Sequence, residues 1–260
     1  MHPLPDVYFL IPQTADWGWF VMQLLLAGLV YWGEGSDRFH LAYSKFRKGG
    51  GISTRTGMLI IYGLPLLVVV LGYNSMQRPD SVYHVVLFLA LAFHFAKRCL
   101  EVIFVHRYSR PMGAGTAFLI GGLYSYIALA AHYQQNSGVS MLEGDSLPLL
   151  PLIFGGLIFL GAQAGNFYHH WLLRNLRSQG ETGYVVPSGG LFDRVAAPHY
   201  LFEIIAWVGY AIMARQLGMW GIVFIITGYL AGRAKQTREW YLKSVPEYPA
   251  ERRALVPGVW

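Results

Sequence analysis

Seven apolar runs alternate with shorter polar segments along the chain. The runs lie near residues 17–33, 58–76, 82–105, 115–134, 148–173, 199–214 and 216–234. About twenty consecutive apolar residues let an α-helix cross the hydrocarbon core of a bilayer. The pattern therefore predicts an all-α integral membrane protein with about seven transmembrane helices, forming a single membrane domain over residues 1–260. The short segment ARQLGMWG separates the last two runs, so the count of seven requires a turn there.

The distribution of basic residues supports an odd number of spans. With seven spans, sixteen of the 20 Lys and Arg residues fall on the side of the C-terminus. Arg78 and Arg215 fall on the other side, and Lys97 and Arg98 lie within the third run. Because basic residues concentrate in cytoplasmic segments, we expect the C-terminus in the cytoplasm and the N-terminus outside. A count of six spans would break this separation.

The composition of the chain indicates a membrane protein and restricts the kinds of ligand that it is expected to bind. Hydrophobic residues make up 54% of the chain and charged residues 13%, whereas an average soluble domain is about 25% charged. In a membrane protein, the net charge of +6 indicates basic residues that contact lipid headgroups and set the orientation in the membrane. It does not indicate a nucleic-acid partner. The nine histidines lack the spacing of a metal site, so we expect no resident metal. The sequence has no glycine-rich dinucleotide fingerprint placed between a strand and a helix.

The second half of the third apolar run contains the polar residues His94, Lys97, Arg98 and Glu101. A charge at membrane depth costs about 2.5–3.5 kcal/mol on insertion scales, so these side chains should face the interior of the bundle. Arg98 and Glu101 are three residues apart and can pair on one helix face. They form either a structural ion pair, or an anion-binding arginine oriented by a carboxylate.

The fifth run ends in the polar stretch AGNFYHHWLLRNLR. On a continuous helix Asn166, His170, Arg174 and Arg177 share one face over roughly 16 Å. This stripe suits a long ligand with an anionic tail, or alternatively a helix end anchored at anionic lipid headgroups.

The sixth run adds further polar residues at helical spacing. His199 and Glu203 are four apart, so they lie on one face of a helix. Together with Arg98 and Asn166 they place polar groups on at least three helices. Such convergence predicts one cavity that opens to the cytoplasm.

Four sequence blocks resemble the superfamily of steroid 5α-reductases and trans-2-enoyl-CoA reductases. HFAKRCLEVIFVHRYS is similar to the enoyl-CoA reductase third-helix motif, and APHYLFEIIAWVGYAIM is similar to the sixth-span motif. GNFYHHWLLRNLR with GETGYVVPSGGLF resembles the cofactor helix and loop, and RAKQTREWYLKSVPEYPAERRALVPGVW resembles the C-terminus. The resemblance runs from about residue 94 to the end of the chain.

The resemblance implies a seven-helix membrane reductase that uses NADPH. Such enzymes transfer a hydride to the β-carbon of an alkene conjugated to a carbonyl, in a lipid-like substrate of the 3-oxo-4-ene steroid or 2-enoyl thioester type. Residues 94–260 would then form the cofactor-binding region, and the helices of residues 1–93 would form part of the substrate cavity. The cofactor site would face the cytoplasm from a bacterial inner membrane or the endoplasmic reticulum.

Site residues can be carried over from the resemblance by position. Glu101 and Glu203 would orient neighbouring groups. Arg98, Arg107, Arg110 and Arg38 would contact phosphates. The remaining NADPH-binding residues would be Asn166, His170, Arg177, Tyr184, His199, Arg233 and Tyr241.

Two departures from the family pattern concern the proton donor. Tyr62 and Gly63 stand where the steroid enzymes carry a Gln-Glu pair, and Phe95 stands where the third helix usually has a tyrosine. Phe95 cannot donate a proton. Tyr62, from a neighbouring helix, or His94 are therefore the candidate catalytic residues. The alternatives are that Tyr62 is a packing residue and that His94 bonds to the backbone.

Two other functions remain compatible with the sequence. Membrane methyltransferases of the isoprenylcysteine or phospholipid type use S-adenosylmethionine and carry an Arg-His-Pro-x-Tyr motif. Here the corresponding stretch, AAPHYLFE, lacks the arginine and has the histidine after the proline. A non-catalytic cofactor-binding relative is the third possibility, because the usual tyrosine and the Gln-Glu pair are absent.

Overall fold

The computed structural model describes residues 14–36, 51–74, 82–108, 111–137, 149–176 and 185–260. In these residues it contains seven α-helices and no β-strand, which confirms the all-α prediction. The helices are α1 (Thr14–Glu34), α2 (Thr54–Tyr73), α3 (Val82–Leu100), α4 (Ala114–Ser137), α5 (Leu149–Asn175), α6 (Pro198–Ala214) and α7 (Leu217–Ser244). The predicted runs match these helices closely, except that α7 continues to Ser244 and not to residue 234.

Four helices within the described residues are long and apolar enough to cross a membrane, namely α2, α4, α5 and α7. The surface supports this assignment. One face of α5 exposes Leu150, Ile153, Phe154 and Leu157, each more than half accessible, and such a continuous apolar face is typical of contact with lipid. The count of seven spans and the orientation of the termini stay predictions.

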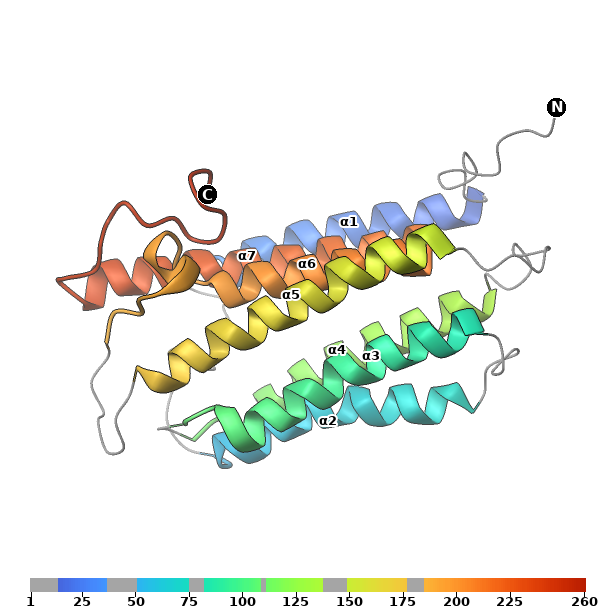
Figure 1. The fold of residues 1–260 in the computed structure, drawn as a ribbon, viewed down its shortest axis with the longest axis horizontal. Helices are drawn as coiled ribbons and strands as arrows, with labels where there is room; N and C mark the ends of the chain where they lie inside the picture. Colours follow the sequence, from blue (N-terminus) through green and yellow to red (C-terminus); the bar gives the residue numbers. More distant parts are fainter. Residues whose placement is uncertain (1–13, 37–50, 75–81, 109–110, 138–148, 177–184) are drawn as a thin grey trace.

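The helices form two layers (Figure 1). The first layer contains α1, α7, α6 and α5, and the second contains α4, α2 and α3. Within the layers α5 packs on α6, α1 on α7, and α2 on both α3 and α4. The layers meet mainly where α3 faces α6 and where α4 faces α7. Successive helices alternate in direction, so α1, α3, α5 and α7 all finish at the same end of the bundle.

Glycines let α5 and α6 approach closely. A Cβ added to Gly155 would clash with the backbone carbonyl of Gly209, and a Cβ added to Gly209 would clash with Phe159 and Gly155. Small residues at such crossings are the usual way for membrane helices to pack. The close approach fixes the relation of α5 to α6, and both helices carry predicted site residues.

The turn between α6 and α7 depends on Arg215. This residue has a φ of 55° and lies in the left-handed region, and its backbone N–H donates to Ala211 O at 3.0 Å. A left-handed residue is a common way to end a helix. Gln216 follows as the N-cap residue, and α7 begins at Leu217. This short turn accounts for the division of the last two apolar runs.

A π-helical turn, η3 (Glu101–Val105), continues α3 directly. The backbone N–H of His106 donates to Glu101 O at 2.8 Å, which is the five-residue step of a π turn. Single π turns inside helices are frequent at functional sites. Glu101, the first residue of the turn, lies three residues after Arg98, and His106 is the first residue after the turn.

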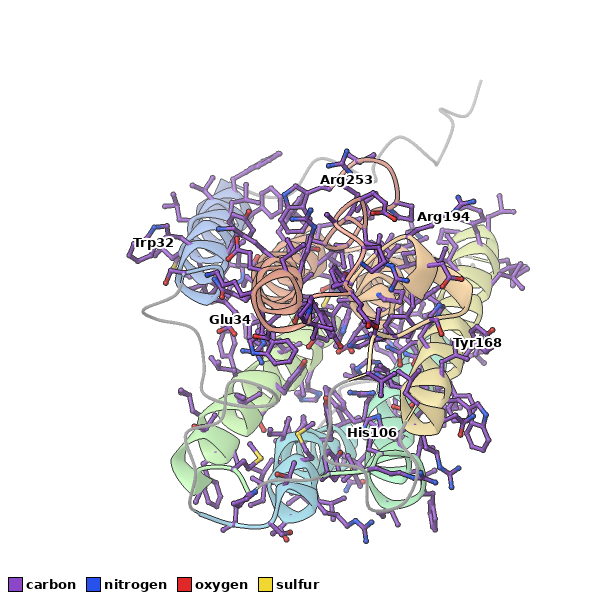
Figure 2. The ribbon with its side chains drawn as sticks, turned by 90° about the vertical axis from the view of Figure 1, so that its left-hand side faces the viewer. Trp32, Glu34, His106, Tyr168, Arg194 and Arg253 are labelled. Carbon is purple, nitrogen blue, oxygen red and sulfur yellow. The ribbon has the colours of Figure 1, made fainter. Side chains whose placement is uncertain are left out.

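The C-terminal segment and the loop before α6 fold together over the end of the bundle, where Figure 2 labels Arg194 and Arg253. Arg253 N donates to Arg194 O at 2.9 Å, and Ala196 N donates to Arg253 O at 2.8 Å. Arg252 Nη1 donates to Pro187 O at 2.6 Å. Between residues 185 and 197 this loop contains the short 3-10 helix η5 (Gly190–Asp193).

Candidate functional site

The guanidinium of Arg98 is the centre of a buried polar cluster between the two layers. Arg98 Nη1 donates to Glu101 Oε2 at 2.5 Å, and Arg98 Nη2 donates to the Tyr62 hydroxyl at 2.6 Å. The guanidinium carbon also lies 4.6 Å from the centre of the Tyr62 ring. All three side chains are buried. The predicted pairing of Arg98 with Glu101 is confirmed, and Tyr62 joins it from α2.

His170 connects this pair to α5. Its Nδ1 lies 3.1 Å from Glu101 Oε2, and its Nε2 lies 3.3 Å from Arg98 Nη1. A carboxylate only accepts and a guanidinium only donates. Arg98 Nη1 lies closer to Nδ1, at 3.0 Å, than to Nε2. His170 therefore contacts both the anion and the cation of the Arg98–Glu101 pair.

Lys97 adds a second cation that contacts the polar stripe of α5. Its Nζ donates to Asn166 Oδ1 at 2.6 Å and forms an ion pair with Glu101 Oε1 at 2.9 Å. Asn166 Nδ2 in turn donates to the carbonyl of His199 at 2.8 Å. Two cations therefore share the carboxylate of Glu101.

Two further histidine rings surround His170. The His106 ring lies edge-on at 4.8 Å, and the His199 ring lies at 5.3 Å. Burial, with the charge of Arg98 second, lowers the pKa of His106 to about 3. His106 is therefore neutral at physiological pH and adds no further positive charge.

A second set of contacts lies one helical turn along α3. His94 Nδ1 lies 2.8 Å from Gln163 Nε2 of α5, and the His94 ring contacts the Trp207 ring of α6 at 5.0 Å. Phe95 contacts Tyr124 and Trp207 at 6.1 and 6.3 Å. These aromatic rings lie beside the charged cluster, on the part of α3 that precedes Arg98.

Glu203 is buried on α6 and faces α4. Tyr124 OH donates to Glu203 Oε1 at 3.4 Å, and the Tyr124 ring lies 5.9 Å from the Tyr62 ring. Glu203 is thus linked to Tyr62 through one aromatic side chain. Its orienting role stays a prediction.

The structure places two predicted cofactor residues in other contacts. Arg233 is 1% exposed, and its Nη1 donates to Glu34 Oε1 of α1 at 2.6 Å. Tyr241 stacks on Tyr248 with 4.8 Å between ring centres. Arg107 is exposed at the end of η3. The remaining predicted residues, Arg38, Arg110, Arg177 and Tyr184, lie outside the described residues.

Three site residues received no role from the sequence. Gln163 lies three residues before Asn166, so the stripe on α5 could have been extended to it. Lys97 was identified only as an intramembrane charge. His169 holds the loop before α6: its Nδ1 lies 2.7 Å from Gly165 O, and Leu191 N donates to its Nε2 at 3.1 Å. No sequence motif marks that contact.

Glu101, His106 and His170 place possible metal-ligand atoms within 4.8 Å of one another. The carboxylate of this trio already pairs with both Lys97 and Arg98. A divalent cation there would meet two positive charges at close range. The arrangement therefore favours an anionic ligand over a metal ion.

Comparisons with known proteins agree with the resemblance. The family described as 3-oxo-5-alpha-steroid 4-dehydrogenase matches residues 113–260. The chain is 31% identical over 204 residues to 3-oxo-5-alpha-steroid 4-dehydrogenase 1 of Homo sapiens, covering 76% of this chain and 77% of the relative. It is 29% identical over 223 residues to a putative enoyl reductase of Schizosaccharomyces pombe, covering 80% and 73%. It is 30% identical over 231 residues to a probable very-long-chain enoyl-CoA reductase of Caenorhabditis elegans, covering 81% and 73%.

The charge balance of the cluster predicts a large effect of Glu101→Gln on stability. The substitution removes the carboxylate that pairs with both Lys97 and Arg98, and breaking a buried pair from one side costs about 3–5 kcal/mol. Thermal unfolding of the detergent-purified protein measures the loss. Glu239→Gln is the matched control, because its pair with Lys235 at 3.8 Å is partly exposed and is worth about 0–1 kcal/mol. Equal losses of stability in Glu101→Gln and Glu239→Gln would contradict the buried ion pairing of Glu101.

The role of His169 is tested by His169→Phe. The variant removes the acceptor for Leu191 N, and an unmade buried hydrogen bond costs about 1–3 kcal/mol. We expect faster amide hydrogen exchange over residues 185–196, measured by mass spectrometry, with the exchange of α2 unchanged. Tyr168→Phe, on an exposed neighbouring ring, should leave the loop protected. If exchange over residues 185–196 is unchanged in His169→Phe, His169 does not anchor this loop.

Proposed function

The chain belongs to the family of steroid 5α-reductases and enoyl reductases, and we propose that it is an NADPH-dependent membrane ene-reductase. The reaction reduces a C=C bond conjugated to a carbonyl. The substrate is lipid-like, of the 3-oxo-4-ene steroid or 2-enoyl thioester type. The cofactor site faces the cytoplasm at the end of the bundle where α3 and α5 finish.

One observation carries the proposal, namely the hydroxyl of Tyr62 held by Arg98. Arg98 Nη2 donates to the phenol oxygen, so the phenol hydrogen is left to donate to another group. Among the described residues, Arg98 is the hydrogen-bond partner of this hydroxyl. Beside it, a Cβ added to Gly63 would meet no atom within 4 Å. Among the described residues, no protein atom therefore fills the space beside Gly63 on α2.

The residues of the cluster fit NADPH. Lys97 and Arg98 place two cations side by side, and the buried Nε of Arg98 has no partner among the described residues. An anionic ligand with many hydrogen-bond acceptors matches this set of donors. Asn166, His170 and His199 would hold it together with Arg98. When bound, NADPH supplies the hydride for the β-carbon of the substrate.

The chain's own residues supply the remaining chemistry. As the β-carbon takes up the hydride, the alkene electrons move toward the carbonyl and form an enolate. Tyr62 donates its proton to the α-carbon, and the enolate electrons form the new C–H bond. The phenolate that remains lies beside the guanidinium of Arg98, which stabilises its charge. Water restores the proton of Tyr62 after product release.

Cofactor choice gives the first test. NADPH should raise the midpoint of thermal unfolding of the detergent-purified protein, with a smaller shift for NADH and none for S-adenosylmethionine. A ligand at a hundred times its Kd stabilises the folded state by about 2.7 kcal/mol. A shift with S-adenosylmethionine alone would favour a methyltransferase. NADPH binding without reduction of any enone or enoyl thioester would favour a non-catalytic relative.

Tyr62→Phe tests the proton donor. Removing a general acid lowers kcat by roughly 10²–10⁴-fold, whereas the thermal shift with NADPH should stay close to that of the parent protein. Tyr83→Phe is the control, because this buried tyrosine donates to Ala214 O at 2.7 Å and has no place in the site. It should lose stability and keep its turnover. Unchanged turnover in Tyr62→Phe would reject Tyr62 as the acid.

A further inference from the structure

Two buried rings from opposite layers lie side by side, and each carries a nitrogen that has no hydrogen-bond partner among the described residues. His94 belongs to α3 and Trp207 to α6, and they are 3% and 2% exposed. Their ring centres are 5.0 Å apart, with 61° between the ring planes. His94 Nε2 and Trp207 Nε1 have no hydrogen-bond partner among the described residues. A buried donor left unpaired costs about 1–3 kcal/mol, so two neighbouring ones call for an explanation.

The contact with Gln163 determines which nitrogen of His94 carries the proton. Gln163 Nε2 lies 2.8 Å from His94 Nδ1. An amide nitrogen only donates, so Nδ1 accepts. In the neutral ring the proton is then on Nε2. His94 Nε2 is therefore a donor, as an indole N–H always is.

We propose that His94 Nε2–H and Trp207 Nε1–H bind the carbonyl oxygen of the substrate and stabilise the enolate formed from it. The inference rests on the proposed ene-reduction. It assigns to the two rings the role of polarising the carbonyl, which Phe95 cannot fill. Tyr62 keeps the separate role of protonating the α-carbon.

The surroundings suit a developing negative charge. Phe95 lies at 5.0 Å from His94 and 6.3 Å from Trp207, and Tyr124 packs on Phe95. Aromatic side chains exclude water, and in a dry site a fixed N–H donor stabilises an oxyanion more than it would in water. The two donors are held in place by their packing, so they need no rearrangement when the charge appears.

The two rings, His94 and Trp207, lie close enough to Tyr62 for one small conjugated group to contact all three. Arg98, which holds Tyr62, follows His94 by one helical turn, roughly 6 Å along α3. Tyr124 contacts both the Tyr62 ring and the Phe95 ring. A carbonyl oxygen at His94 and Trp207 thus leaves the adjacent α-carbon on the side of Tyr62. The alkene then extends toward the cationic cluster.

The infrared stretch of a bound carbonyl tests the inference without turnover. The probes are testosterone and trans-2-hexadecenoyl-CoA, each labelled with carbon-13 at the conjugated carbonyl and added to the detergent-purified protein without cofactor. We expect the band of at least one probe to move to lower wavenumber than in empty micelles. Trp207→Phe and His94→Phe should each reverse part of that shift. A wild-type band that does not move overturns the inference.

Kinetics of the same variants separate this role from packing. Removing one donor to an oxyanion lowers kcat by about 10²–10³-fold, so Trp207→Phe and His94→Phe should each lose that much with the NADPH thermal shift retained. Trp220→Phe is the control, a half-buried tryptophan of α7 packed on the same core. It should keep both its turnover and the band position. If Trp207→Phe and His94→Phe both keep the kcat of Trp220→Phe, the inference is overturned, even if one of them is less stable.

The outcomes distinguish this inference from the proposed function. If the wild-type protein reduces neither probe with NADPH, the proposed function fails, and the carbonyl band still reports on His94 and Trp207. If the wild-type protein reduces a probe and the two variants match the control, the inference alone fails.

Discussion

The buried guanidinium of Arg98 constrains the whole arrangement. A charge within an apolar bundle is tolerated only when counter-charges and hydrogen-bond partners surround it. Arg98 obtains these from Glu101 on its own helix, from Tyr62 on α2 and from His170 on α5. The partners come from both layers, so compensating one charge also sets how α3 sits against α5. Stability and chemistry therefore depend on the same residues.

The interface between the layers differs in character from the packing within them. Within a layer, small and apolar side chains let helices approach closely, as Gly155 and Gly209 do for α5 and α6. Between the layers, polar contacts such as Lys97 to Asn166 and His94 to Gln163 recur along α3. Polar groups in an apolar bundle are retained mainly where they bind or react with something. The site thus follows the seam along which the two layers meet.

Apolar periodicity was sufficient to predict the seven helices, and intramembrane polar residues identified much of the site. Arg98, Asn166, His199 and Glu203 were expected to converge on one cavity, because lipid cannot accommodate them separately. The partner of Arg233 was not predictable: Glu34 is 199 positions away, and nothing in the first apolar run marks it. The tautomer of His94 also needed the structure, because it depends on which atom of Gln163 faces the ring. Local spacing reveals a shared helix face, whereas contacts between distant helices require the packing.

The π turn at Glu101–Val105 has a consequence for how this segment can vary. Geometrically, such a turn is an α-helix with one residue inserted. The helix before it keeps its register with α2 and α6, while everything after it is rotated by about 100°, the angle of one α-helical residue. A one-residue deletion in this turn would restore the ordinary helix and swing His106 away from His170 without disturbing Arg98. The number of residues in this turn therefore sets where His106 lies relative to His170, while Arg98 keeps its place in the helix before it.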